Sequence, residues 1–318
     1  MIIAVHPASA QSLQESEPSA LQRPAQLVWI DTDIGDDIDD AFALALLLKS
    51  PEVRILGIST TFGDTETRAR LVDRFLDRFL AGAGAPSIPV TAGLPTKTAN
   101  VLTQRAYAEG FPARPHPDAV AALLAAIQAH PGQVTLLAIG PLFNVAAASQ
   151  RSPETFHKLK RIVMMGGSIR RGYNSPCGKP TPPSPEWNIL QDPPGAQQVF
   201  ATGVPVFLLP LDSTQIPLSL AARLKLFAAA NPLTDQLALL YPEWTAHSWN
   251  HSPTPILYDA LAAASILKPR LCPTRPMRIA VNDQGFTLTT AGPPNAQVCL
   301  QSDATGFSRL MTERIEKK

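Results

Sequence analysis

Short apolar runs alternate with segments of helical periodicity along most of this chain. The apolar runs are rich in Val, Ile and Leu, as is typical of buried strands. They occupy Leu27–Asp31, Val53–Thr60, Val134–Ile139, Ile162–Met165 and Val206–Leu209. Helices are expected at Asp40–Lys49, Glu66–Ala81, Asp118–His130, Phe143–Ser149 and Pro194–Thr202. This alternation predicts an α/β fold with an open, mostly parallel central sheet and helices on both faces.

The C-terminal part of the chain changes to short β-like segments separated by turn residues. The expected strands are Met277–Val281, Phe286–Thr290 and Gln297–Leu300. A final helix is expected at Thr305–Ile315. We therefore expect a C-terminal β-hairpin and helix that close one domain spanning residues 27–318.

Two segments show neither strand nor helix periodicity. Residues 1–26 are rich in Gln, Ser, Pro and Ala, which is typical of a disordered leader or a truncated signal peptide. The small residues Ala8 and Ala10 resemble a cleavage site and favour export, with a cytoplasmic tail as the alternative. Residues Arg170–Pro185 contain five prolines and two glycines. This segment is interpreted either as a lid or as a proline-stiffened surface connection.

Six aspartates fall within Asp31–Asp40, directly after the first expected strand and before the first helix. Carboxylates this crowded repel one another unless a cation is bound, and their oxygens favour hard ions such as Ca²⁺ or Mg²⁺. The carboxyl edge of an open α/β sheet is also where ligands bind. A solvated turn or a helix N-cap accounts for one or two of these aspartates, but not for six. The segment therefore predicts a metal site.

Two other kinds of metal-binding protein, EF-hand proteins and Mg²⁺-dependent phosphohydrolases, also carry clustered aspartates. An EF-hand beginning at Asp31 would have Asp36 and Phe42 at its sixth and twelfth positions, where Gly and Glu are required. A Mg²⁺-dependent phosphohydrolase, with Asp31 or Asp33 as nucleophile, fits the pattern better and stays open as an alternative.

Composition excludes several classes of protein. The net charge is +1 and there is no long Lys/Arg run, so no nucleic-acid partner is expected. The longest apolar run after the start, Ala41–Leu48, is too short to span a membrane. The three cysteines, Cys177, Cys272 and Cys299, lack zinc-site spacing. They are expected to be packing residues or free thiols. A bridge between two of them stays open as an alternative that nothing in the sequence supports.

Several segments, taken in order, resemble the inosine-uridine-preferring nucleoside hydrolase family. The run IDTDIGDDIDDAFALAL resembles the family's N-terminal D-x-D-x-G-x-D-D-A signature, with a turn two residues longer after Gly35. The later matching segments are LLAIGPLFNVAAA, IVMMGGS, PEWNILQDPPGA, PLDST and YDALAAA. The resemblance covers the chain from about Leu27 to the C-terminus. It implies hydrolysis of the N-glycosidic bond of ribonucleosides to free base and ribose.

The resemblance also implies a Ca²⁺ site. Its expected ligands are Asp33, Asp40, Asp259 and the backbone carbonyl of Ile139. Asp33 would also act as the general base on a Ca²⁺-bound water, and Asp31 would support the site from behind.

Sugar binding is implied for a second group of polar residues. Asp39 matches the family's sugar-hydroxyl carboxylate, and Glu186 with Asn188 matches its Glu-x-Asn pair. Asn174 is a further candidate from the proline-rich segment. Asp64 follows Gly63, where many members have Asn, and can still accept a hydrogen bond from a sugar hydroxyl.

The histidine that protonates the leaving base in better-known members has no counterpart at the matching position of this sequence. Better-known members carry His at the position of Tyr258, so we expect proton donation from Tyr258 or from His251, with His247 as a further option. Stacking on Trp187, Trp249 or Tyr241 is the alternative means of activation. A non-catalytic, metal-stabilised binder of nucleosides or ribose stays open. The family implies a homo-oligomer, either a dimer or a tetramer.

Overall fold

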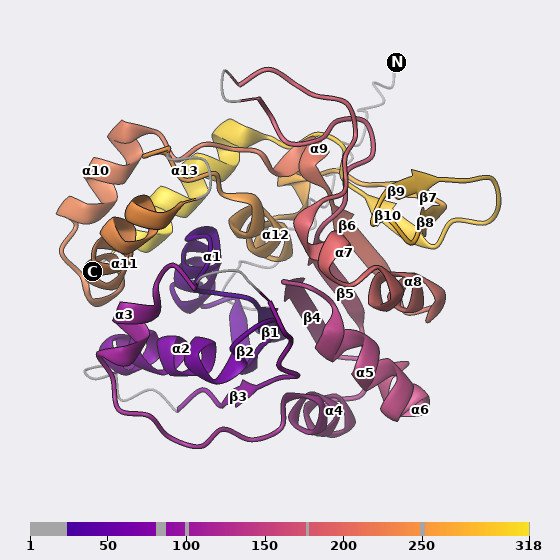
Figure 1. Cartoon of the computed structure of the whole chain (residues 1–318), viewed down its shortest axis with the longest axis horizontal. Helices are drawn as coiled ribbons and strands as arrows, with labels where there is room; N and C mark the ends of the chain where they lie inside the picture. Colours follow the sequence, from indigo (N-terminus) through magenta and orange to yellow (C-terminus); the bar gives the residue numbers. More distant parts are fainter. Residues whose placement is uncertain (1–23, 81–86, 99–101, 176–177, 249–251, 318) are drawn as a thin grey trace, which may run out of the picture.

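A computed structural model of the chain describes residues 24–80, 87–98, 102–175, 178–248 and 252–317 (Figure 1). Its centre is an eight-stranded sheet in the order β3-β2-β1-β4-β5-β6-β10-β7. All paired neighbours are parallel except β7 and β10, which are antiparallel. The strands of this sheet are β1 (Gln26–Thr32), β2 (Val53–Thr60), β3 (Val90–Ala92), β4 (Val134–Ile139), β5 (Arg161–Met165), β6 (Val206–Leu209), β7 (Arg275–Met277) and β10 (Ala296–Val298). The predicted open, mostly parallel sheet is confirmed, whereas residues 1–23 of the predicted leader lie outside the described residues.

Helices cover both faces of the sheet (Figure 1). One face packs against α1 (Asp39–Leu48), α2 (Thr65–Leu80), α10 (Leu220–Ala228), α11 (Pro232–His247), α12 (Tyr258–Leu267) and α13 (Ala304–Ile315). The other face packs against α4 (Ala119–Ala129), α5 (Phe143–Arg151), α6 (Pro153–Phe156) and α8 (Pro193–Ala201). Strand β1 shows why both layers form. Val28 and Ile30 join the first core and Trp29 joins the second, as alternate side chains of a strand must.

The remaining elements are short. They are α3 (Arg105–Glu109), α7 (Trp187–Gln191), α9 (Leu211–Thr214), the 3₁₀ turn η2 (Pro269–Leu271) and the antiparallel hairpin of β8 (Ile279–Val281) and β9 (Thr287–Thr289). None of the described helices is both long and apolar enough to cross a bilayer.

The C-terminal hairpin and helix are confirmed, but one expected strand is divided. Met277–Val281 forms two strands, because the chain changes pairing partner at Arg278. The Asn295 side chain stabilises the chain at this point. It accepts a hydrogen bond from the Ile279 N–H at 2.8 Å and donates one to the Ile279 carbonyl at 2.9 Å. The third expected strand joins the central sheet as β10, beside β6.

The proline-rich segment 170–185 is anchored to α9 at its start. The carboxylate of Asp212 accepts hydrogen bonds from the backbone N–H groups of Ile169 and Arg170, each at 2.9 Å. Gln215 accepts from the Asn174 N–H at 2.6 Å and donates to the Gly172 carbonyl at 3.1 Å. These bonds bring the first half of the segment against the domain.

The structure corrects the expectation for the cysteines. Cys272 follows η2 and Cys299 follows β10, and the two are joined by a disulfide with their Cα atoms 5.5 Å apart. Both residues are buried. Their separation of 27 residues gave no sign of this proximity, which arises because β10 enters the central sheet. Cys177 lies outside the described residues.

The disulfide is expected to stabilise the fold by closing a 27-residue loop in the unfolded chain. Replacing both cysteines by alanine should lower the free energy of unfolding by about 3.5 kcal/mol, as chain entropy predicts for such a loop. Urea denaturation of the wild type and the double variant measures this. Dithiothreitol should destabilise only the wild type, and equal stability of the two proteins would contradict the expectation.

Candidate active site

The acidic segment lies at the point where the sheet changes its direction of winding. From β1 the chain continues to β2 on one side, while β4 flanks β1 on the other. The carboxyl ends of two such strands leave a crevice between their loops, which is the usual ligand site of this architecture. Asp33 directly follows β1, and the backbone of Ile139, the last residue of β4, pairs with Thr32.

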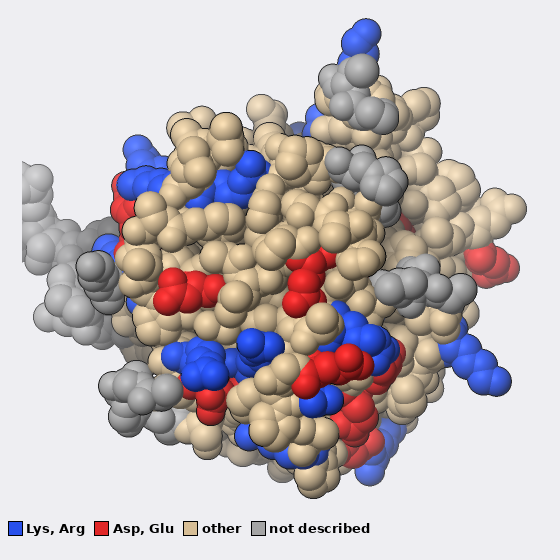
Figure 2. Space-filling view, turned by 60° about the vertical axis from the view of Figure 1, so that its left-hand side comes forward, with Lys and Arg blue, Asp and Glu red and all other residues tan. Residues whose placement is uncertain are grey.

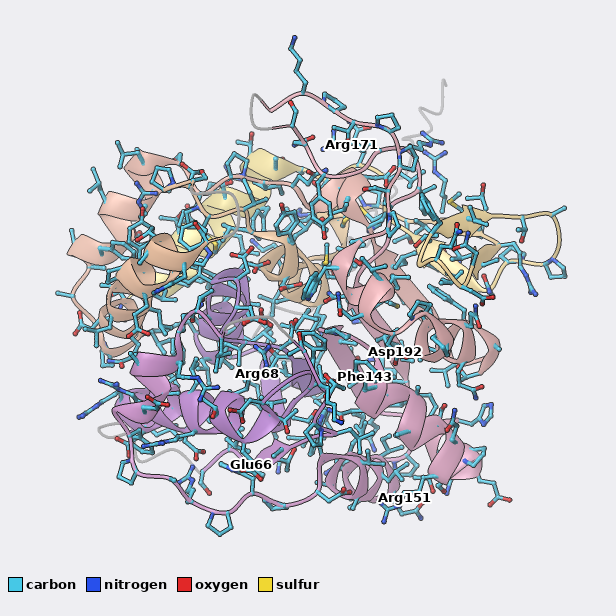
Figure 3. The ribbon with its side chains drawn as sticks, viewed as in Figure 1. Glu66, Arg68, Phe143, Arg151, Arg171 and Asp192 are labelled. Atoms are coloured by element: carbon cyan, nitrogen blue, oxygen red, sulfur yellow. A yellow bond between two sulfur atoms is a disulfide. The ribbon has the colours of Figure 1, made fainter. Side chains whose placement is uncertain are left out.

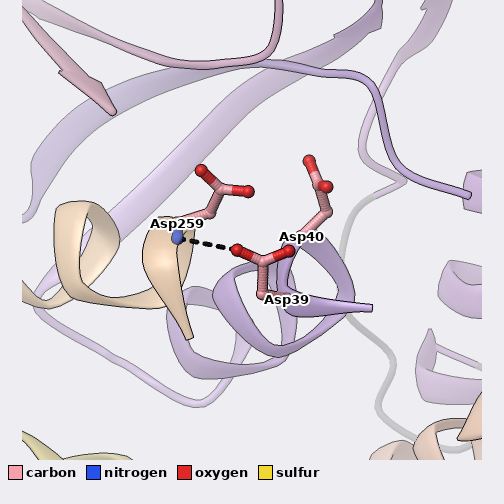
Figure 4. A group of neighbouring side chains, drawn as sticks. All are labelled: Asp39, Asp40 and Asp259. Carbon is pink, nitrogen blue, oxygen red and sulfur yellow. Dashed lines mark hydrogen bonds between the residues drawn. The ribbon is translucent and has the colours of Figure 1, made fainter. Parts of the chain in front are cut away.

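Three aspartates from distant parts of the chain meet in this crevice (Figure 4). Asp39 and Asp40 begin α1 and Asp259 is the second residue of α12, and one ligand atom from each lies within 4.8 Å of the others. All three are buried. The Asp259 N–H donates to Asp39 Oδ2 at 3.0 Å, whereas Asp259 Oδ1 has no partner. Buried oxygens placed together in this way fit a hard divalent cation.

Asp31, in β1, and Asp33, just after β1, have different surroundings. Asp33 lines the cavity described below. Asp31 is fully buried and is held from behind, because Oδ1 accepts from the Ser59 hydroxyl at 2.5 Å and from the Asn144 amide at 2.8 Å. Thr32 between them donates its hydroxyl to Asp40 Oδ1 and accepts from the Ile34 N–H at 3.1 Å. Asp31 therefore supports the site without lining the cavity.

A cavity of about 570 Å³ opens over the acidic cluster. Its far wall is the start of α7, where Glu186 caps the helix. The Glu186 carboxylate accepts from the N–H groups of Gly167, Asn188 and Ile189 at 2.8, 3.0 and 3.3 Å. Asn188 also lines the cavity and donates its side-chain amide to the Met165 carbonyl at 3.2 Å. The predicted residues Asp33, Asp39, Asp40, Glu186, Asn188 and Asp259 are thus brought into one cavity.

Aromatic side chains form another part of the cavity wall. Tyr258, Tyr173 and Trp244 line it, and the rings of Tyr173 and Tyr258 meet edge to face with centroids 6.2 Å apart. His247, at the end of α11, is exposed and also lines the cavity, whereas Tyr241 is not among the lining residues. Trp187 lines the cavity as expected. His251 and Trp249 lie outside the described residues.

Two predicted sugar-binding residues lie elsewhere. Asp64 is exposed at the start of α2 and pairs with Arg105 at 2.9 Å, beside a second, smaller cavity. Asn174 is half-buried, its side-chain oxygen has no partner, and it is not among the residues that line the main cavity. Their roles stay predictions.

Arg68 of α2, labelled in Figure 3, was not identified from the sequence. Its contacts hold the acidic turn in place. Its side chain is 2% exposed, and its guanidinium pairs with Asp36 at 2.6 Å. It also donates to the carbonyls of Asp33, Ile34 and Phe62, the last two at 2.9 and 2.8 Å. A charged residue on the buried face of α2, beside Ala69 and Val72, was the available signal for this role.

Burial raises the pKa of the clustered carboxyl groups. It raises the pKa of Asp39 to about 6, of Asp33 to about 7 and of Asp37 to about 8. The pKa values of Asp40 and Asp259 lie well above the usual range, through burial first and then the neighbouring carboxylates. Burial without a bound cation therefore favours the protonated forms of these carboxyl groups.

Comparisons with known proteins agree with this geometry. The sequence profile described as "Inosine-uridine preferring nucleoside hydrolase" matches residues 28–309. A pyrimidine-specific ribonucleoside hydrolase, RihA, of Salmonella agona is 31% identical over 316 residues, covering 91% of this chain and 98% of the relative.

Solved structures share the fold. The plant nucleoside hydrolase PpNRh1 superposes with a TM-score of 0.79 at 24% identity, over 93% of this chain and 100% of that one. A purine-preferring ribonucleoside hydrolase from Gardnerella vaginalis gives a TM-score of 0.75 at 24% identity, over 92% and 98%. At these identities the likeness concerns the fold.

The fold and the acidic crevice, together with these matches, define a hydrolase that acts on N-glycosyl compounds. The chain belongs to the inosine-uridine preferring nucleoside hydrolase family.

Removing the Arg68 guanidinium should destabilise the protein. Arg68→Met leaves the Asp36 carboxylate and three carbonyls without their donor, so the free energy of unfolding should fall by about 3 kcal/mol. Urea denaturation measures the change. Arg78→Met, an exposed arginine on the same helix, is the matched control, with an expected change within about 0.5 kcal/mol. A similarly small loss for Arg68→Met would show that the turn does not depend on it.

Metal-free protein should lose stability as the pH rises. A carboxyl group whose pKa is raised by folding stabilises the fold while it is protonated, below its unfolded pKa near 3.8, and this contribution is lost as the pH passes about 6 to 8. The melting temperature in chelator should therefore fall between pH 5.5 and 8.5. Added Ca²⁺ should raise it more at pH 8.5, and a cation effect independent of pH would argue against binding at this cluster.

Proposed function

We propose that this enzyme hydrolyses the N-glycosidic bond of ribonucleosides, using Ca²⁺ and with Asp33 as the general base. One observation carries the proposal: Asp39, Asp40 and Asp259 meet in the same cavity as Asp33 and the Glu186–Asn188 pair. The matched relatives are named for both pyrimidine and purine nucleosides, so the proposal covers ribonucleosides as a class.

Asp33, Asp40 and Asp259 would hold the cation, with the Ile139 carbonyl at the end of β4 as a further ligand. Asp40 and Asp259 lie together in the acidic cluster, and Asp39 lies beside them. A bound Ca²⁺ would supply Lewis-acid binding for water and sugar hydroxyls. Oxygen donors in this number and charge favour Ca²⁺ over softer metals.

Each chain residue then has a defined task. Asp33 accepts the proton of the attacking water, and the Trp187 side chain partly offsets the effect of burial on the pKa of this carboxyl group. Asp39, Glu186 and Asn188 face the cavity and would receive the sugar hydroxyls. The surrounding negative charge favours the oxocarbenium-like sugar of the transition state. Tyr258 lines the cavity and carries a hydroxyl that can donate to the leaving base.

The phosphohydrolase alternative fits this cavity poorly. No Lys or Arg is found among the described residues that line it, whereas seven acidic residues are. A phosphate group needs cationic or backbone N–H donors and would be repelled here.

Base and reducing-sugar release from purine and pyrimidine ribonucleosides tests the proposal. Release should require Ca²⁺, cease in excess chelator, and fall by about a thousandfold in kcat for Asp33→Asn, as expected when a general base is lost. Glu109→Gln, at an exposed residue that is not among those lining the cavity, is the control and should keep full activity.

Three results would count against parts of the proposal. Full activity of Asp33→Asn would remove Asp33 as the base. Activity with Mg²⁺ alone would remove the preference for Ca²⁺. No release from any ribonucleoside, by protein whose melting temperature rises with Ca²⁺, would point instead to a binding protein.

A further inference from the structure

Arg68 lies inside the molecule and binds two segments at once. Figure 2 shows lysine and arginine side chains at the surface, where these residues usually lie, whereas the Arg68 side chain is 2% exposed. Its guanidinium binds the acidic turn, through Asp36 at 2.6 Å and the Ile34 carbonyl at 2.9 Å. Its Nε also donates to the Phe62 carbonyl at 2.8 Å, and the guanidinium carbon lies 5.9 Å from the centre of the Phe62 ring. Arg68 therefore connects Phe62 to the turn that leads to the candidate metal ligands.

Phe62 has a backbone conformation that residues with side chains seldom adopt. Its φ is +66°, in the left-handed region, and the φ of Gly63 is also +66°. Glycine adopts this region freely, whereas it is unfavourable for a bulky residue. Two hydrogen bonds between Gly63 and Thr96, at 2.8 and 3.2 Å, hold the turn. A phenylalanine in this conformation indicates that its ring has a role that glycine could not fill.

The Phe62 ring is buried and contacts two other aromatic rings. It is nearly parallel to the Phe143 ring, with centroids 6.4 Å apart and planes at 13°. It meets the Trp187 ring edge to face, with centroids 5.7 Å apart and planes at 83°. Phe143 begins α5 and Trp187 begins α7, so three separate segments meet at Phe62. Of these three residues Trp187 lines the cavity, and Phe62 packs behind it.

Trp187 stands between Glu186 and Asn188, the two candidate sugar-binding residues of this wall. Helix α7 has five residues, too few to be stable without tertiary contacts. Trp187 supplies two such contacts: its N–H donates to the Tyr173 hydroxyl at 3.0 Å, and its ring meets Phe62. A displacement of Trp187 would therefore move Glu186 and Asn188 relative to the acidic cluster.

We propose that Phe62 is a positioning residue for the reaction. Its ring, held by Arg68, supports Trp187 and so sets the separation between the acidic turn and α7 across the cavity. A misplacement of about 1 Å can lower the rate about a hundredfold, so a residue that does not touch the substrate can control catalysis. This inference rests on the N-ribohydrolase function proposed above and adds a residue to its machinery.

A double-mutant cycle on kcat/KM for uridine and inosine tests this role. Phe62→Leu removes the contact with Trp187 and should lower kcat/KM about tenfold, near the upper end of what one edge-to-face contact contributes. Trp187→Leu removes the residue through which Phe62 acts, so adding Phe62→Leu to it should lower kcat/KM by less than about threefold. Equal losses in the two backgrounds would overturn the inference.

Phe156→Leu is the matched control, because Phe156 is a buried phenylalanine of the other core layer and is not among the residues that line the cavity. It should destabilise the protein and leave kcat/KM unchanged. The same loss of kcat/KM in Phe156→Leu as in Phe62→Leu would assign the effect to a loosened core and overturn the positioning role. Phe62→Gly, which suits the left-handed backbone, covers the case in which Phe62→Leu does not fold, and should lower kcat/KM as much.

The fluorescence of Trp187 tests the contact without any need for activity. Its signal is the difference between proteins that carry Trp187 and the matching Trp187→Phe variants. Acrylamide should quench this signal more strongly in Phe62→Leu than in the wild type, because the ring behind the indole is gone. Equal quenching in the folded proteins would overturn the inference. If neither uridine nor inosine is hydrolysed, the proposed function is overturned, and the quenching still decides whether Phe62 holds Trp187.

Discussion

Repulsion among the carboxylates at the end of β1 is the constraint on which the rest of the structure depends. Helices α1 and α12 pack together with Asp39, Asp40 and Asp259 in their first turns, so two positive helix ends face the cluster. Arg68 binds the carbonyls of the turn, and Ser59 with Asn144 satisfies one oxygen of Asp31. The two helix ends and these side chains together offset part of the repulsion between the carboxylates.

The sequence predicted the central sheet well because its strands are buried on both faces and appear as continuous apolar runs. Helices α10, α11 and α12 were not identified. In α12 nearly every side chain is buried, so no polar face marks the helix, while α11 contains Pro242 and α10 exposes Leu220 and Leu224. The disulfide was missed because it depends on the order of strands in the sheet, which brings β10 beside β6. The local pattern of apolar residues does not predict that order.

Six candidate site residues stand in segments that are recognisable in the sequence, and the structure brings them into one cavity. Their roles stay predictions. Arg68 could not be placed, because it acts through contacts with a turn far away in sequence. Asp64 shows the opposite case: it was a candidate for sugar binding, but in the fold it pairs with Arg105 on the surface. Whether side chains from distant segments meet depends on tertiary packing. A motif predicts such a meeting only where the chain packs as the other proteins with that motif do.

The contact between Asp39 and Asp259 joins residues 220 positions apart. A ribosome must therefore synthesise most of the chain before the cluster can form, and contacts over such a distance are among the last to be made. Until then the three carboxylates are not available together to one cation. Binding of a cation by all three would thus require that the N-terminal and C-terminal parts of the domain have met, so that completion of folding and onset of activity coincide.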